Sequence, residues 1–106
     1  MDEKLLFSDF LVKSTNLCGF LLTEKKEELL SKRLFEACCS FSEYLSSTAN
    51  PSITKAEVSS LRKSASLEAD KISLYLSALF SAGFISSAQS ESMLRSLDAV
   101  KKQINI

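Results

Sequence analysis

Hydrophobic residues recur along the chain at intervals of three and four, with charged residues and serines between them. At 100° per residue, this spacing places the apolar positions of each segment on one face of an α-helix. The pattern therefore predicts four amphipathic helices packed around a shared core. The predicted core positions are Leu6, Phe10, Leu17 and Leu21; Leu30, Leu34, Ala37, Cys38, Phe41 and Leu45; Val58, Leu61, Ala65, Ala69, Ile72, Leu76 and Leu79; and Met93, Leu97, Val100 and Ile104.

The hydrophobic pattern is interrupted at 23–26, at 48–53, which contains the only proline, and at Gly83-Phe84. Glycine commonly follows a helix end, and proline cannot continue one. Because short connections make successive helices antiparallel neighbours, we expect an all-α, antiparallel up-down-up-down four-helix bundle. It forms a single domain over 1–106, with helices at 4–22, 27–48, 54–82 and 86–105.

Two of these starts have a capping-box pattern, Thr54 with Glu57 and Ser86 with Gln89. In this motif the hydroxyl accepts a hydrogen bond from an N-terminal amide, and the longer side chain accepts one in return. The third and fourth helices are therefore expected to begin directly after Thr54 and Ser86.

Composition removes most kinds of catalytic site. The 106 residues include no histidine and no tryptophan, only two glycines, and equal numbers of basic and acidic residues. The commonest general base and metal ligand is absent, and no glycine-rich phosphate loop is possible. An enzymatic hypothesis rests on Cys39 alone, and a packing role for the cysteines is the simpler interpretation. We expect a non-enzyme with no cofactor, no metal and no small-molecule substrate.

No apolar run approaches the roughly 20 residues of a membrane span, and the first residues do not resemble a signal peptide. Three cysteines, two of them adjacent, fit neither a disulfide framework nor a zinc site. The sequence therefore predicts a cytoplasmic protein.

A second apolar stripe lies on the outer face of the third helix. Leu67, Leu74 and Ala78 point roughly opposite Ala65. Each leucine contributes about 1.5 to 3 kcal/mol when buried, so we expect another copy of the chain to cover them. Phe35, off the main stripe of the second helix, is assigned to the same interface. The alternative is that single exposed leucines are common and have no function.

Basic residues are the remaining candidate site, because phosphate contacts require only lysine and arginine on a shared surface. Short basic stripes arise where such residues stand a heptad apart, and further basic groups lie at Arg95 and Lys101-Lys102. The alternative, which the neighbouring glutamates favour, is a solvated helix face. The predicted nucleic-acid contacts are Lys25, Lys32, Arg33, Lys55, Arg62 and Lys63.

From 31 to 85 the chain resembles the small bacterial four-helix-bundle proteins called 23S rRNA intervening-sequence proteins, which include the accessory variability determinant of diversity-generating retroelements. Four segments show the resemblance: 31–41 (SKRLFEACCSF), 54–58 (TKAEV), 61–71 (LRKSASLEADK) and 79–85 (LFSAGFI). Tyr44 and Ser47 stand where the family commonly has asparagine and glutamate, and Asp70 replaces a glutamate of the third helix. The resemblance implies a non-enzymatic, ring-like homo-oligomer, a pentamer in relatives, with nucleic-acid binding proposed for the basic members.

Two functions follow from these observations. The first is a self-associating helical-bundle binding protein that contacts RNA, or a nucleic-acid-handling partner, through clustered lysines and arginines. The second is a structural homo-oligomeric scaffold for another protein, without nucleic-acid binding. Their responses to salt and to RNA distinguish them, because phosphate contacts weaken steeply as salt rises.

Overall fold

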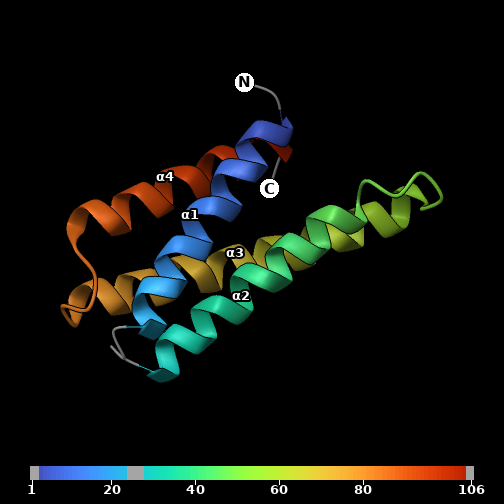
Figure 1. Ribbon diagram of the computed structural model, residues 1–106. Coiled ribbons are helices and arrows are strands. Elements are labelled where there is room, and N and C mark those ends of the chain that lie inside the picture. Colours follow the sequence, from blue (N-terminus) through green and yellow to red (C-terminus); the bar gives the residue numbers. More distant parts are fainter. Residues whose placement is uncertain (1–2, 24–27, 105–106) are drawn as a thin grey trace.

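The computed structural model describes residues 3–23 and 28–104. Within these ranges the chain forms four helices and no strand, which confirms the predicted all-α class (Figure 1). The four helices are α1 (Glu3–Thr23), α2 (Glu28–Ser47), α3 (Lys55–Ser81) and α4 (Ser87–Ile104). None of them is long and apolar enough, within the described part of the chain, to cross a membrane.

The helices are arranged as two pairs. α2 and α3 lie side by side, and α1 and α4 form a second pair that packs on them (Figure 1). α1 also contacts α2, whereas α3 and α4 share the smallest helix–helix contact. The turn between α2 and α3 extends beyond the α1–α4 pair, so the molecule is elongated, with extents of 43 × 27 × 20 Å.

The core follows the predicted apolar faces. Phe10 of α1 and Phe41 of α2 are both fully buried, and their rings meet edge to face with centroids 5.3 Å apart. This is a favoured geometry for aromatic pairs. Every predicted core residue whose side chain is described is buried or half-buried, and Leu6 is the one whose side chain lies outside that description. Cys18 and Ile85 join the core as well.

The end of α3 is fixed by Gly83, whose φ of +83° lies in the left-handed region. The Gly83 amide donates to the carbonyl of Phe80 at 3.0 Å, and the Phe84 amide donates to that of Leu79 at 2.9 Å. This pair of bonds is the Schellman motif, which satisfies the last carbonyls of a helix. The chain can therefore turn into α4 within the five residues, 82–86, that connect the two helices.

Both predicted caps form. The Glu57 amide donates to Thr54 Oγ1 at 3.1 Å, which satisfies an N-terminal amide of α3. At α4 the box is complete, because the Gln89 amide donates to Ser86 Oγ at 3.1 Å and the Ser86 amide donates to Gln89 Oε1 at 2.8 Å. These bonds fix where the two helices begin.

Candidate nucleic-acid interface

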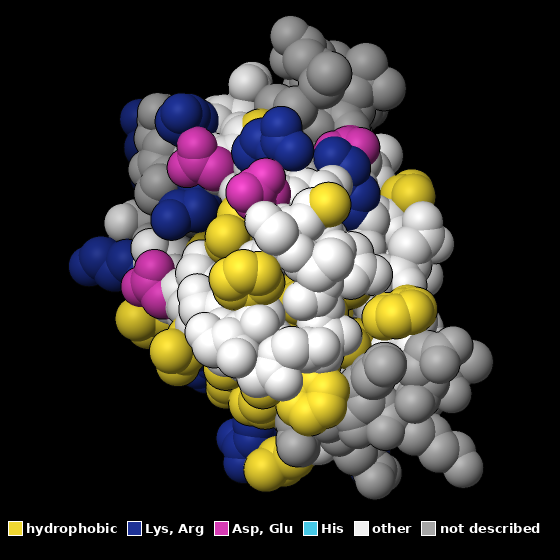
Figure 2. Space-filling model, turned by 90° about the vertical axis from the view of Figure 1, so that its left-hand side faces the viewer, with side chains coloured by type: hydrophobic (Ala, Val, Ile, Leu, Met, Phe, Trp, Pro, Cys, Tyr) yellow, Lys and Arg dark blue, Asp and Glu magenta, His cyan; other side chains and the backbone are white. Residues whose placement is uncertain are grey.

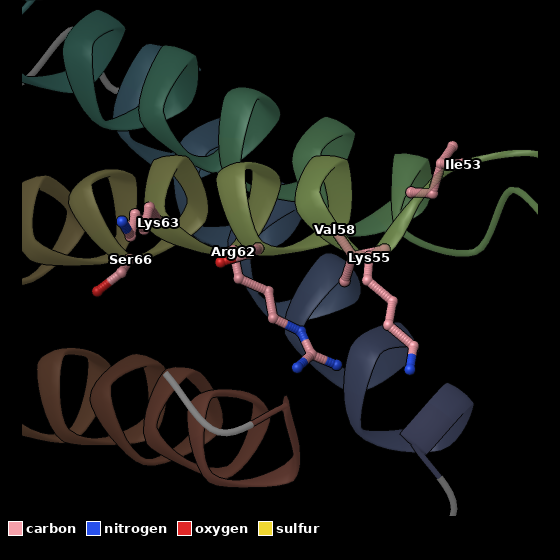
Figure 3. Close-up of a pocket in the computed structure, with 7 residues that line it drawn as sticks. Ile53, Lys55, Val58, Arg62, Lys63 and Ser66 are labelled. Carbon is pink, nitrogen blue, oxygen red and sulfur yellow. The ribbon is translucent and has the colours of Figure 1, made fainter.

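A hollow of about 560 Å³ lies along the first half of α3 (Figure 3). Lys55 and Arg62 extend from the same side of the helix, toward α1 and α4. They share that side because seven residues make nearly two full turns. Half-buried apolar residues form part of the wall, and serines line the rest. The lining residues are Ile53, Lys55, Val58, Ser59, Arg62, Lys63 and Ser66.

The three cations of this hollow have no carboxylate partner among the described residues. Elsewhere lysines are paired within their own helix, as Lys13 is with Asp9 at 3.2 Å and Lys71 with Glu68 at 3.3 Å. A lysine that is paired with a carboxylate must give up that ion pair to bind an anion. An unpaired lysine binds the anion without this loss. The hollow therefore combines net positive charge with exposed ammonium and guanidinium groups, which is the arrangement that phosphate contacts require.

A second hollow of about 340 Å³ lies between α3 and α4. It includes two more cations, Arg95 and Lys101, neither of which was among the six predicted contacts. Its one carboxylate, Asp98, is already paired with Lys102 at 3.1 Å. The lining residues are Ser73, Leu94, Arg95, Leu97, Asp98 and Lys101. Sequence spacing could not place the two α4 cations beside Ser73 of α3, because that proximity depends on how the two helices pack.

The other predicted contacts lie elsewhere. Lys32 and Arg33 are exposed on α2 and line neither hollow. Lys25 lies outside the described residues. The structure thus brings together Lys55, Arg62 and Lys63 from the predicted set.

The structure also brings together only some of the predicted oligomer contacts. Leu67 and Leu74 are each 64% exposed and line one hollow of about 400 Å³ with Tyr44 of α2. Ala78 is half-buried on the same stripe of α3. Phe35 is 46% exposed but lies one turn before Cys38, whose thiol is hydrogen-bonded to Cys18 of α1. It therefore lies on the α1 side of α2, away from the two leucines.

Neither Cys38 nor Cys39 shows activation, and Cys18, whose pKa the hydrogen bond with Cys38 lowers, is 1% exposed and so out of reach of a substrate. The pKa of Cys38 is raised above its usual range, first by the hydrogen bond with Cys18 and then by burial. Cys39 is exposed, and its pKa is also raised, by partial desolvation and then by the nearby Cys18 and Glu43. A nucleophilic thiol needs a lowered pKa. The described residues also contain no group of three or more possible metal ligands.

The charge at one end of the bundle is mixed. Figure 2 shows one end of the bundle, where basic and acidic side chains lie next to one another and hydrophobic side chains form separate patches. A surface of this kind gives no extended field of one sign. The unpaired cations on α3 therefore stand out as a local feature of a neutral protein.

No protein-family model matches the chain, and no curated protein matches it. A solved structure does match: a protein of unknown function from the S23 ribosomal protein family of Bacteroides thetaiotaomicron. It superposes with a TM-score of 0.86 at 23% identity, over 97% of this chain and 94% of that one. The likeness shows a shared fold, and it supports the predicted family at the level of the fold.

Proposed function

We propose that this chain is a non-enzymatic, self-associating helical bundle that binds RNA through the hollow of Lys55, Arg62 and Lys63. The observation that supports this most is the absence, among the described residues, of any carboxylate paired with these three cations. RNA is the favoured polyanion because the structural neighbour is described as a member of a ribosomal protein family.

The proposal includes an architecture and an assembly. The helices follow an antiparallel up-down-up-down order in one domain, and copies associate through Leu67 and Leu74 into a ring, a pentamer by family resemblance, in the cytoplasm. Assembly matters because a chain with zero net charge has few phosphate contacts to offer. A ring repeats the same small basic hollow around its axis, so several weak contacts act together.

The test is fluorescence anisotropy of a labelled RNA at several salt concentrations. The double variant Arg62→Ala/Lys63→Ala removes two charges from the hollow, while Lys13→Ala/Lys71→Ala removes two charges that are paired with carboxylates. We expect only the first variant to weaken binding, and to reduce the slope of log K against log salt by about 1.4 for a single strand. Light scattering shows whether each variant keeps the wild-type mass. Equal binding by the two double variants, at equal mass, would reject the role of the hollow.

A protein scaffold is the second candidate function, and the exposure of Leu67 and Leu74 favours it. The double variant Leu67→Ser/Leu74→Ser is expected to reduce the mass of the assembly toward the 11.7 kDa of one chain. Val12→Ser is the control, because Val12 is similarly exposed, at 59%, but lies on α1. A stable oligomer that ignores RNA at every salt concentration would favour the scaffold. A wild-type monomer would contradict both self-association and the ring.

A further inference from the structure

The hollow on α3 is one end of a longer stripe on the same helix. Ser59, Ser66, Ser73 and Phe80 follow one another at seven-residue intervals. Seven residues at 100° fall about 20° short of two full turns, so these four positions form a line that drifts by about 60° in all along α3. Ser59 and Ser66 line the first hollow, and Ser73 lines the second. The two hollows therefore follow one edge of α3, and α4 lines the second of them.

Positive charge continues along this edge. Lys55, Arg62 and Lys63 lie in the first hollow, and α4 adds Arg95 and Lys101 in the second. The Arg95 Nε donates to the Glu91 carbonyl at 3.4 Å, a backbone contact that leaves its charge uncompensated. The five cations thus accompany the serine line over most of its length, and serine hydroxyls are themselves common donors to phosphate.

An aromatic residue stands at the far end of the line. Phe80 lies in the last turn of α3, and 47% of its surface is exposed. A large aromatic side chain left half in water at the end of a line of cations and serines has the composition of a single-strand binding site, where cations follow the backbone and aromatic rings stack on bases. In a duplex the bases are paired and stacked on one another, so they are not available to stack on an aromatic ring at this position.

We propose that the α3–α4 edge from Lys55 to Phe80 is a track for a single-stranded polynucleotide, with phosphates on the cations and a base stacked on Phe80. This inference rests on the proposed RNA binding and specifies its ligand and its additional contacts, Phe80, Arg95 and Lys101. The track is about 38 Å long at 1.5 Å per residue, which corresponds to about eleven nucleotides of a stacked strand at 3.4 Å each. That length is within the range of known single-strand sites.

The test measures anisotropy with labelled oligo(U) and oligo(dT) of 4, 8, 12 and 16 nucleotides and with a 12-base-pair duplex. We expect affinity to rise up to about 12 nucleotides and then to level off, and the duplex to bind more weakly than the single strand of equal length. The oligo(U) and oligo(dT) series show whether the track prefers RNA or accepts both. Length-independent binding, or a duplex that binds as well as the single strand, would overturn the proposal.

Phe80→Ala tests the stacking contact, and Phe35→Ala is its control because the two rings are exposed to the same degree, 47% and 46%. We expect Phe80→Ala to weaken binding about fivefold or more, with Phe35→Ala unchanged. Arg95→Ala/Lys101→Ala is expected to weaken the 12-nucleotide strand more than the 4-nucleotide one, because only a longer strand reaches both hollows. Equal losses at both lengths would contradict a continuous track.

Tryptophan fluorescence tests the stacking contact without relying on a change in affinity. The chain has no tryptophan, so Phe80→Trp and Phe35→Trp each introduce a single reporter. We expect oligo(U) to quench the fluorescence of the first and not the second. If Arg62→Ala/Lys63→Ala abolishes binding while Phe80→Trp is not quenched, RNA binding stands and the track is wrong. If Arg62→Ala/Lys63→Ala has no effect, the proposed function itself fails.

Discussion

The two glycines of the chain provide a test of how backbone conformation alone affects stability. A Cβ atom built on either Gly19 or Gly83 meets no other atom within 4 Å, so alanine fits sterically at both positions. The difference lies in the backbone, because Gly19 is inside α1 and Gly83 has a φ of +83°. Alanine is therefore expected to have opposite effects at the two sites.

The magnitudes follow from that difference. At Gly83 the left-handed conformation costs alanine about 1 to 2 kcal/mol, offset by about 0.4 to 1 kcal/mol because alanine restricts the unfolded chain. The net loss for Gly83→Ala is about 1 kcal/mol. At Gly19 the helical preference of alanine over glycine adds about 0.8 to 1 kcal/mol of stability. The two variants are thus expected to differ by about 2 kcal/mol in free energy of unfolding.

Urea unfolding followed by circular dichroism measures both variants, at one protein concentration because the proposed self-association would contribute to apparent stability. The expected midpoints lie on opposite sides of the wild type, with equal m-values. In thermal unfolding, 1 kcal/mol corresponds to about 5 °C for a domain of this size. A Gly83→Ala variant as stable as the wild type would show that the Schellman turn relaxes without strain. A destabilised Gly19→Ala variant would show that α1 does not tolerate a methyl group there.

Three further outcomes follow from the fold. Phe41→Ala is expected to cost about 3 to 5 kcal/mol, because it opens a cavity in the fully buried core and removes the ring contact with Phe10; urea unfolding measures the loss. Ser86→Ala removes the hydroxyl that caps α4 and is expected to cost about 1 kcal/mol by the same assay, whereas Ser87→Ala, one residue later, is the control. The hydrogen bond between the two buried thiols raises the pKa of Cys38 and lowers that of Cys18, so above about pH 8.5 the folded pair still holds one proton that the unfolded chain has released, and the free energy of unfolding is expected to fall as pH rises further. Unfolding at pH 8.5 and at pH 9.5 checks this, and a Cys38→Ala variant with the same slope over that interval would contradict it.

The helices could be predicted from the sequence because each has a strong apolar face. Ala65, Ala69 and Ile72 show why: small and branched apolar residues recur on one side of α3, and all three are fully buried. The caps were predictable for a similar reason, since the Ser86 and Gln89 bonds join residues three apart. Local spacing determines both features.

The candidate site was only partly predictable. Lys55 and Arg62 share a side of α3 by heptad spacing, but the hollow that Arg95 forms with Ser73 depends on the position of α4, which no local pattern specifies. Conversely, Phe35 and Leu67 are both exposed apolar residues, yet they lie on different sides of the α2–α3 pair. Only the packing of helices distant in sequence decides which surface residues become neighbours.

The first turn of α1 lies beside the last turn of α4 (Figure 1), while the exposed turn at Asn50, Pro51 and Ser52 lies beyond the α1–α4 pair. The start of the first helix and the end of the last are therefore neighbours. The packing of the helices does not require the chain termini to be at this position. A circular permutant that joins α4 to α1 by a short linker and opens at Asn50-Pro51 would run in the order α3, α4, α1, α2 with every helix contact retained. Opening there would place both new ends at the tip of the molecule, next to the hollow that Ile53 and Lys55 line.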